Sequence, residues 1–232
     1  MTQEIEVGIG KTARLCYSLD DISVVPSRRT RDPEDVDTSW QIDAYSFDIP
    51  VIGAPMDSIM SPGTVIEMGK LGGLGVLDLE GLWTRYDDPA PLLDRIPDIP
   101  QDKVTPYLQK IYSEPVKAEL ITRRLHDIRD AGVTVAGSLT PQRILEFYST
   151  VLDAGVDLFV IRGSAVSAEH VSASHKPLNL KQFIYELDVP VIVGGAGSYH
   201  AAIHLMRTGA AGVLVGLGGT AVSSSRSVTG MH

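Results

Sequence analysis

The residues best suited to chemistry lie in a glycine-rich stretch that is followed by hydroxyl groups. Gly216-Leu217-Gly218-Gly219-Thr220 precedes Ser223-Ser224-Ser225-Arg226. Glycine has no side chain to keep a ligand away from the backbone, so successive N–H groups can approach a phosphate closely. The serine hydroxyls and the Arg226 guanidinium can complete the shell of an anion. The stretch therefore predicts an anion-binding loop.

Other polar residues follow the ends of apolar runs. Arg162-Gly163-Ser164 comes after one such run, and Asp57, Asp78 and Glu80 come after two others. An arginine in this place suits a phosphate or a carboxylate, and a structural ion pair is the alternative. Carboxylates in these places either take part in chemistry or tie down loops.

A repeating pattern of strands and helices supplies the elements that position these residues. Short runs that are apolar on both faces occur at 133–137, 157–161, 189–193 and 211–215, with helical segments between them. Strands of this kind are expected to be parallel and covered by helices. Three of the helices are expected to close on a left-handed glycine in an Ala-Gly pair. These pairs are Ala131-Gly132, Ala154-Gly155 and Ala211-Gly212.

The N-terminal half supplies two further strands and one helix. The strands are expected at 51–54 and 74–77, and the helix starts at Ser61-Pro62-Gly63. The buried face of this helix is expected to consist of Val65, Ile66, Met68 and Leu71. The polar segment 78–101 is expected to be an active-site loop or a subunit contact.

Six strands in one series suit either a doubly wound sheet or three quarters of a (β/α)8 barrel. Strands that end in glycine recur, and barrel enzymes place their functional loops at the C-terminal ends of the strands, which favours the barrel. The predicted organisation is an N-terminal arm over residues 1–48, with charges of both signs, and a partial barrel of catalytic type over residues 49–232.

Five motifs, in order and spacing along the whole chain, resemble the IMP dehydrogenase / GMP reductase family. They are Val51-Ile52-Gly53-Ala54-Pro55-Met56-Asp57, Leu71-Gly72-Gly73-Leu74-Gly75-Val76, Ala154-Gly155-Val156-Asp157, Val193-Gly194-Gly195 and Gly212-Val213-Leu214-Val215-Gly216-Leu217-Gly218. The resemblance implies a (β/α)8 TIM-type barrel. This chain would supply about six of its βα units and would be truncated at the C-terminus. Many members carry a CBS-domain insertion after the second strand, so the chain is most similar to the branch without it.

The resemblance also implies an oxidoreductase that binds a purine 5′-monophosphate, uses NAD or NADP as hydride partner and forms a homotetramer. Its nucleotide-binding residues would be Met56, Gly216, Gly218, Gly219 and Ser224, and Arg162 and Ser164 would contact the cofactor. Ser223 stands at the position of the family's catalytic cysteine. A serine needs a neighbouring base that a thiol does not, so the alternative is a nucleotide-binding or interaction protein with impaired catalysis.

Composition argues against several other classes of protein. The net charge of −9 and the pI near 5.1 argue against partners such as nucleic acid or an anionic membrane. The one cysteine, Cys16, fits a reducing cytoplasm and excludes an intrachain disulfide. His200 and His204 have metal-ligand spacing, but no carboxylate lies at helical distance on the same face, so no metal is predicted.

Overall fold

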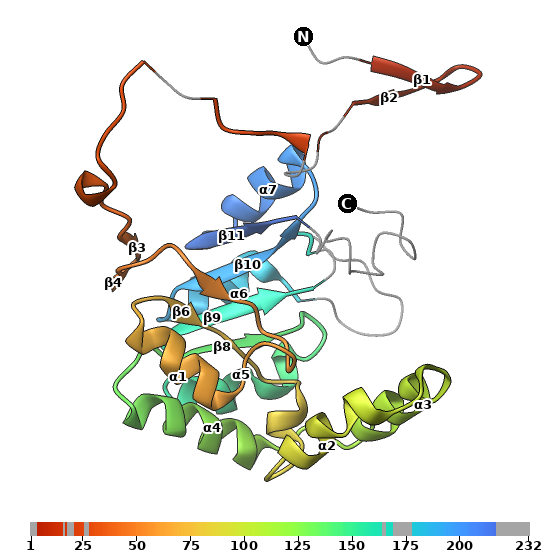
Figure 1. Cartoon of the computed structure of the whole chain (residues 1–232), viewed down its shortest axis with the longest axis vertical. Coiled ribbons are helices and arrows are strands. Elements are labelled where there is room, and N and C mark those ends of the chain that lie inside the picture. Colours follow the sequence, from red (N-terminus) through yellow and green to blue (C-terminus); the bar gives the residue numbers. More distant parts are fainter. Residues whose placement is uncertain are drawn as a thin grey trace. The chain divides into compact units, whose positions relative to one another are not determined.

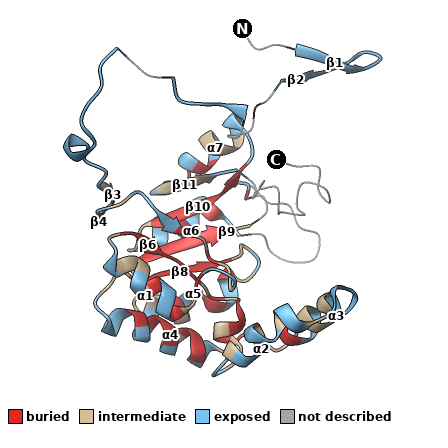
Figure 2. Ribbon diagram, in the orientation of Figure 1, coloured by how far each residue is buried: buried red, intermediate tan, exposed pale blue. Residues whose placement is uncertain are grey.

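The computed structural model describes residues 4–15, 17, 21–25, 28–163, 166–168 and 178–216. The chain falls into two compact units, Met1–Asp37 and Thr38–His232. The first unit contains an antiparallel pair, β1 (Glu4–Gly8) and β2 (Lys11–Arg14), and a short 3-10 helix, η2 (Pro33–Asp35). Every side chain described in this unit is exposed (Figure 2).

The second unit is built on parallel strands that lie in sequence order (Figure 1). A five-stranded sheet has the order β11-β10-β9-β8-β7, and β5 pairs with β6. Only Val76 separates β6 from β7, so the two are halves of one interrupted strand. The bounds are β5 Ile52–Gly53, β6 Leu74–Gly75, β7 Leu77–Asp78, β8 Ala136–Leu139, β9 Leu158–Arg162, β10 Val191–Ala196 and β11 Gly212–Val215.

This order decides between the two architectures that the sequence allows. A doubly wound sheet reverses its strand order at a switch point, whereas a barrel keeps its strands in sequence order. No reversal occurs among the described strands, and each pair in the series is parallel. The prediction of a (β/α)8 barrel fold, with about six βα units in this chain, is confirmed.

Helices connect the strands and cover one side of the sheet. Figure 1 shows α1, α4 and α5 along one side of it. The connecting helices are α1 Pro62–Lys70, α4 Ala118–Asp130, α5 Ile144–Asp153, α6 Leu180–Glu186 and α7 Tyr199–Met206. Helix α1 begins with a capping box between Ser61 and Thr64 and has Pro62 in its first turn, as the sequence predicts.

Alternating side chains of the strands build two cores, which is why the strands are apolar on both faces. Phe159 and Ile161 of β9 pack in a cluster with the helices, whereas Leu158 and Val160 belong to a second cluster. The second cluster also contains Ile42 and Phe47. These two residues come from a hairpin of β3 (Trp40–Ile42) and β4 (Tyr45–Phe47), so part of the segment assigned to the arm from sequence packs with the barrel strands.

The hairpin is fixed at the N-terminal end of β9. The Tyr45 hydroxyl donates to Asp157 Oδ1 at 3.2 Å, and the other Asp157 oxygen accepts from the Val135 N–H at 2.8 Å. The candidate functional residues Asp78 and Arg162 lie at the opposite, C-terminal ends of β7 and β9.

Two local expectations are wrong. Gly132 and Gly155 do take left-handed conformations, both with φ of 75°. The third helix ends at Met206, however, and the left-handed glycine after it is Gly209, with φ of 92°, whereas Gly212 is the first residue of β11. Leu71 is 70% exposed and is the C-cap residue that follows Lys70, so it does not belong to the buried face of α1.

The polar segment after β7 contains more regular structure than the sequence indicates. It forms η3 (Leu82–Thr84), α2 (Ala90–Asp94), η4 (Ile96–Asp98) and α3 (Gln101–Tyr112). We refer to residues 79–117, which connect β7 to α4, as the excursion.

Candidate functional site

The C-terminal ends of β5 and β9 are joined by one hydrogen bond. Arg162 is the last residue of β9 and is half-buried, and its Nη1 donates to the carbonyl oxygen of Pro55 at 2.6 Å. Pro55 immediately precedes Met56, which is also half-buried. The bond therefore holds a guanidinium beside the loop that carries Met56, and it brings together two of the residues predicted to bind ligands. The sequence suggests that Arg162 binds a ligand anion or forms an ion pair. In the structure, this nitrogen of Arg162 donates instead to a backbone carbonyl.

Asp57 ties the excursion to the end of β5. Its Oδ2 accepts a hydrogen bond from the Leu82 N–H at 2.8 Å and another from the Tyr112 hydroxyl at 2.6 Å. Burial raises the pKa of the Tyr112 hydroxyl, and its hydrogen bond to the Asp57 carboxylate raises it further. The other oxygen of Asp57 is buried and has no partner in the described part of the chain. Asp57 thus fixes Leu82 and Tyr112 of the excursion near the C-terminal end of β5.

Arg85 completes this attachment of the excursion. Its Nη1 donates to the carbonyl oxygens of Tyr112, at 2.9 Å, and Glu114, and its Nε donates to the Glu80 carbonyl at 2.9 Å. Neither Tyr112 nor Arg85 is among the residues expected from sequence. Both lie in a segment whose polar composition indicates only a loop, and no local spacing connects them to Asp57.

Asp78 is the carboxyl group with the most altered pKa at this end of the strands. Burial raises the pKa of Asp78 from 3.8 to about 6, and the charges of Asp57 and Glu80 also raise it. The Glu80 N–H, which donates to Asp78 Oδ1 at 2.9 Å, and the charge of Arg162 lower it. A carboxyl group with such a pKa exchanges its proton near neutral pH, which suits it to acid–base chemistry. Glu80 instead accepts from the Thr140 N–H at 2.5 Å and ties two strand ends together.

Gly216 lies at the end of β11 in a small cavity of about 290 Å³. The cavity is formed by the end of β10, the start of α7 and the end of β11, with Ala196, Gly197, Ser198, Tyr199, Ala202, Val215 and Gly216 as lining residues. Gly216 has φ of 97° and open space where a side chain would point. Its N–H, however, already donates to the Ala196 carbonyl at 2.8 Å, so Gly216 shapes the cavity and offers no donor to an anion.

The remaining predicted ligand-binding residues lie outside the described residues. They are Ser164, Gly218, Gly219, Ser223, Ser224, Ser225 and Arg226. The roles expected for them stay predictions.

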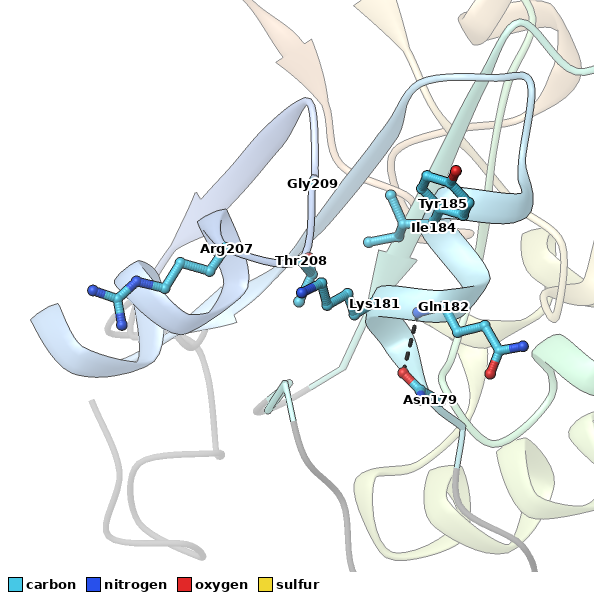
Figure 3. Close-up of a pocket in the computed structure, with 8 residues that line it drawn as sticks. All are labelled: Asn179, Lys181, Gln182, Ile184, Tyr185, Arg207, Thr208 and Gly209. Atoms are coloured by element: carbon cyan, nitrogen blue, oxygen red, sulfur yellow. Dashed lines mark hydrogen bonds between the residues drawn. The ribbon is translucent and has the colours of Figure 1, made fainter.

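A larger cavity of about 540 Å³ lies between α6 and the C-terminal end of α7 (Figure 3). Lys181 extends toward Thr208, whereas Arg207 points away from α6. The only hydrogen bond drawn among the lining residues joins the Gln182 N–H to Asn179 Oδ1, at 3.1 Å, and it caps α6. The polar groups do not converge on a ligand here, so the strand ends are the better candidate for the functional site.

Two further searches cover only the part of the chain that the structure describes. No group of three or more His, Cys, Asp or Glu side chains there could hold a metal ion. No helix in that part is both long and apolar enough to cross a membrane.

Comparison with known proteins gives the family. Residues 16–232 match the IMP dehydrogenase / GMP reductase domain. The chain belongs to this family. An uncharacterized oxidoreductase of Mycolicibacterium smegmatis is 47% identical over 233 residues, which cover 98% of this chain and 62% of that protein. The inosine-5′-monophosphate dehydrogenase of Cryptosporidium parvum is 22% identical over 226 residues, which cover 92% of this chain and 54% of that enzyme.

A solved structure of the same family supports the fold. The crystal structure of an IMP dehydrogenase/GMP reductase-like protein from Corynebacterium glutamicum superposes with a TM-score of 0.91 at 47% identity, covering 99% of this chain and 61% of that chain. The present chain thus spans about three fifths of the length of the Mycolicibacterium smegmatis and Corynebacterium glutamicum proteins.

Proposed function

We propose that this protein is a purine nucleotide-binding oxidoreductase that transfers hydride between an IMP-type nucleotide and NAD or NADP. The observation that carries the proposal is the hydrogen bond from Arg162 to Pro55, which holds a cation beside Met56 at the C-terminal ends of the strands. In barrel enzymes this is the end that binds substrate. Membership of the IMP dehydrogenase / GMP reductase family supports the reaction class.

Met56 supplies an apolar contact for the purine base in this proposal. The phosphate is held by the backbone of Gly218 and Gly219 and by Ser224, since the N–H of Gly216 is engaged within the protein. Ser223 takes the place of the nucleophile. These assignments rest on the family resemblance together with the geometry of Met56 and Gly216.

The residues at the strand ends fit a nicotinamide dinucleotide. A guanidinium has five N–H donors, and within the described residues Arg162 uses one of its nitrogens, on Pro55. The remaining donors suit the anionic pyrophosphate, with Ser164 as a neighbouring hydroxyl. When bound, the cofactor supplies the hydride acceptor or donor.

A second candidate function is nucleotide binding without appreciable catalysis. The observation that favours it is the serine at position 223, because a serine hydroxyl ionises far less readily than a thiol near neutral pH. The two functions share the nucleotide site and differ in turnover alone.

One set of measurements separates these functions. Calorimetry on the full-length protein is expected to show tighter binding of IMP than of inosine, because the phosphate of IMP adds charge-assisted hydrogen bonds. Equal affinities would remove the phosphate site. NADH formation from IMP and NAD that is lost in Ser223→Ala supports the oxidoreductase; nucleotide binding without turnover supports the second function. Turnover that survives Ser223→Ala would place the chemistry on another residue.

We further propose that the protein is cytoplasmic and homotetrameric. The single cysteine supports a reducing compartment, and the family resemblance supports the tetramer. Cell fractionation and light scattering on the purified protein test the two statements.

A further inference from the structure

The side chain of Arg162 reaches across the C-terminal ends of neighbouring strands. Arg162 is the last residue of β9, and Pro55, whose carbonyl oxygen accepts from Arg162 Nη1 at 2.6 Å, follows β5. In the strand order, β8 and the interrupted strand β6–β7 lie between β5 and β9. The guanidinium therefore spans the ends of the two intervening strands.

Asp78 ends one of these intervening strands and points to the same side of the sheet as Arg162. Val76 and Val160 belong to the second core cluster, which is built by the strands and the β3–β4 hairpin. Alternate residues of a strand share a face, so Asp78, two residues after Val76, and Arg162, two residues after Val160, face that side as well. The register pairs Asp78 with Ser138 of β8, and Ser138 with Val160. Asp78 and Arg162 therefore both face the barrel interior near its C-terminal end.

Several elements contribute the titratable and charged groups around Asp78. Burial is the main cause that raises the pKa of Asp78 to about 6, and the charges of Asp57, after β5, and Glu80, in the excursion, raise it further. The Glu80 N–H and the charge of Arg162 lower it. Tyr112 of α3 also lies in the field of Asp78, whose charge helps to raise the pKa of the Tyr112 hydroxyl. No ion pair joins Asp78 to Arg162 within the described residues, so the two interact through their charges alone.

An anion bound to Arg162 must change the proton affinity of Asp78. Among the described residues Arg162 uses one nitrogen on Pro55, and its other N–H groups can bind an anion. Such an anion adds negative charge near Asp78, which favours the protonated, neutral carboxyl. Like charges roughly 10 Å apart in a partly buried site repel enough to strengthen proton binding about tenfold. Binding of an anion and binding of a proton are therefore linked here.

We propose that Asp78 belongs to the cofactor site and takes up a proton from solvent when the anionic pyrophosphate of the dinucleotide binds to Arg162. This inference rests on the proposed function, which places the pyrophosphate on that guanidinium. The proton removes a negative charge that would otherwise repel the pyrophosphate. Asp78 makes no contact with the reacting atoms, and its role is to set the charge beside Arg162.

Calorimetric titration of NAD into the full-length protein, in two buffers of different ionisation enthalpy, tests the inference because the difference in heat counts the protons taken up. At pH 7 a carboxyl group with a pKa of about 6 is about one tenth protonated, and tenfold stronger proton binding makes it about half protonated. An uptake of about 0.4 proton per NAD is therefore expected. Asp78→Asn should abolish this uptake and, because it lacks the charge, bind NAD up to about tenfold more tightly at pH 8.

Controls separate this inference from the proposed function. Asp88→Asn also removes a carboxylate, but Asp88 is exposed, so the uptake of the unaltered protein should persist in this variant. The same comparison is made with NADP, and the difference between the unaltered protein and Asp78→Asn cancels the protons that the 2′-phosphate of NADP exchanges. Equal uptake in these two proteins would overturn the inference and leave the proposed function standing, as would an affinity of the unaltered protein that does not fall between pH 5 and 8. Absence of binding of both NAD and NADP would overturn both.

Discussion

Replacing Asp78 by asparagine should stabilise the protein at neutral pH. Burial raises the pKa of Asp78 from 3.8 to about 6, so the folded state holds the proton more tightly than the unfolded state does. Between these values the unfolded chain releases a proton that the folded chain keeps, and the free energy of unfolding therefore falls as pH rises. The difference of about two pKa units corresponds to about 3 kcal/mol above pH 6.

Asparagine removes this pH-dependent cost and keeps the local hydrogen bond. Its side-chain oxygen can still accept from the Glu80 N–H, as Asp78 Oδ1 does at 2.9 Å. Urea unfolding is expected to show Asp78→Asn more stable than the unaltered protein by up to about 3 kcal/mol at pH 7.5, by about half as much near pH 5, and little different below pH 4.

Asp88→Asn is the matched control. Asp88 Oδ1 accepts from the Ala90 N–H at 3.1 Å, also two residues ahead, but Asp88 is exposed. The control is expected to change stability by less than about 0.5 kcal/mol at pH 7.5. A gain from Asp78→Asn that does not vary with pH, or an equal gain in the control, would refute the assignment of a raised pKa to Asp78.

Three further substitutions test the contacts that position the site and the helices. Tyr112→Phe removes the hydroxyl that donates to Asp57 and should destabilise the protein by about 1–2 kcal/mol in urea unfolding, a value kept low because Tyr112 is 39% exposed. Gly155→Ala and Gly132→Ala both force alanine to a φ of 75° and should each destabilise the protein by about 1 kcal/mol in urea unfolding. The Arg129 guanidinium that the new methyl group at position 155 would meet is the mobile end of a side chain and can move aside, so similar costs are expected at the two positions. Ser61→Ala removes the N-cap hydrogen bond of α1, which should lower the free energy of unfolding by about 1 kcal/mol and reduce the thermal midpoint. An unchanged midpoint would argue against the capping box.

The periodic part of the fold follows from the sequence because its signals are local. Strands apolar on both faces and the glycines at 132 and 155 each depend on a few adjacent residues. The third Ala-Gly pair repeats the same letters, yet α7 ends earlier, at Met206, and the left-handed glycine that follows it is Gly209. In this turn the Thr208 hydroxyl donates to the Leu205 carbonyl at 2.6 Å. Several residues can accept the left-handed conformation, and tertiary packing selects one of them.

The candidate site is less predictable because its contacts join distant segments. Asp57 and Tyr112 are 55 residues apart, and no pattern in the polar excursion indicates that they meet. Likewise, sequence places Gly216 in a donor loop, but pairing of β11 with β10 takes its N–H for Ala196. Which backbone donors remain for a ligand depends on strand register, which single-sequence patterns do not determine.

The way the excursion is attached allows a segment of it to be replaced or extended. The Tyr86 hydroxyl donates to the Ile111 carbonyl at 3.0 Å, so the two ends of the intervening segment already lie side by side. Closing a longer segment between ends that are held together costs free energy that grows only with the logarithm of its length. A foreign domain spliced between these ends, such as a fluorescent reporter, would leave the strands in register. The excursion therefore offers a position at which the chain can accept an inserted domain while its strands keep their pairing.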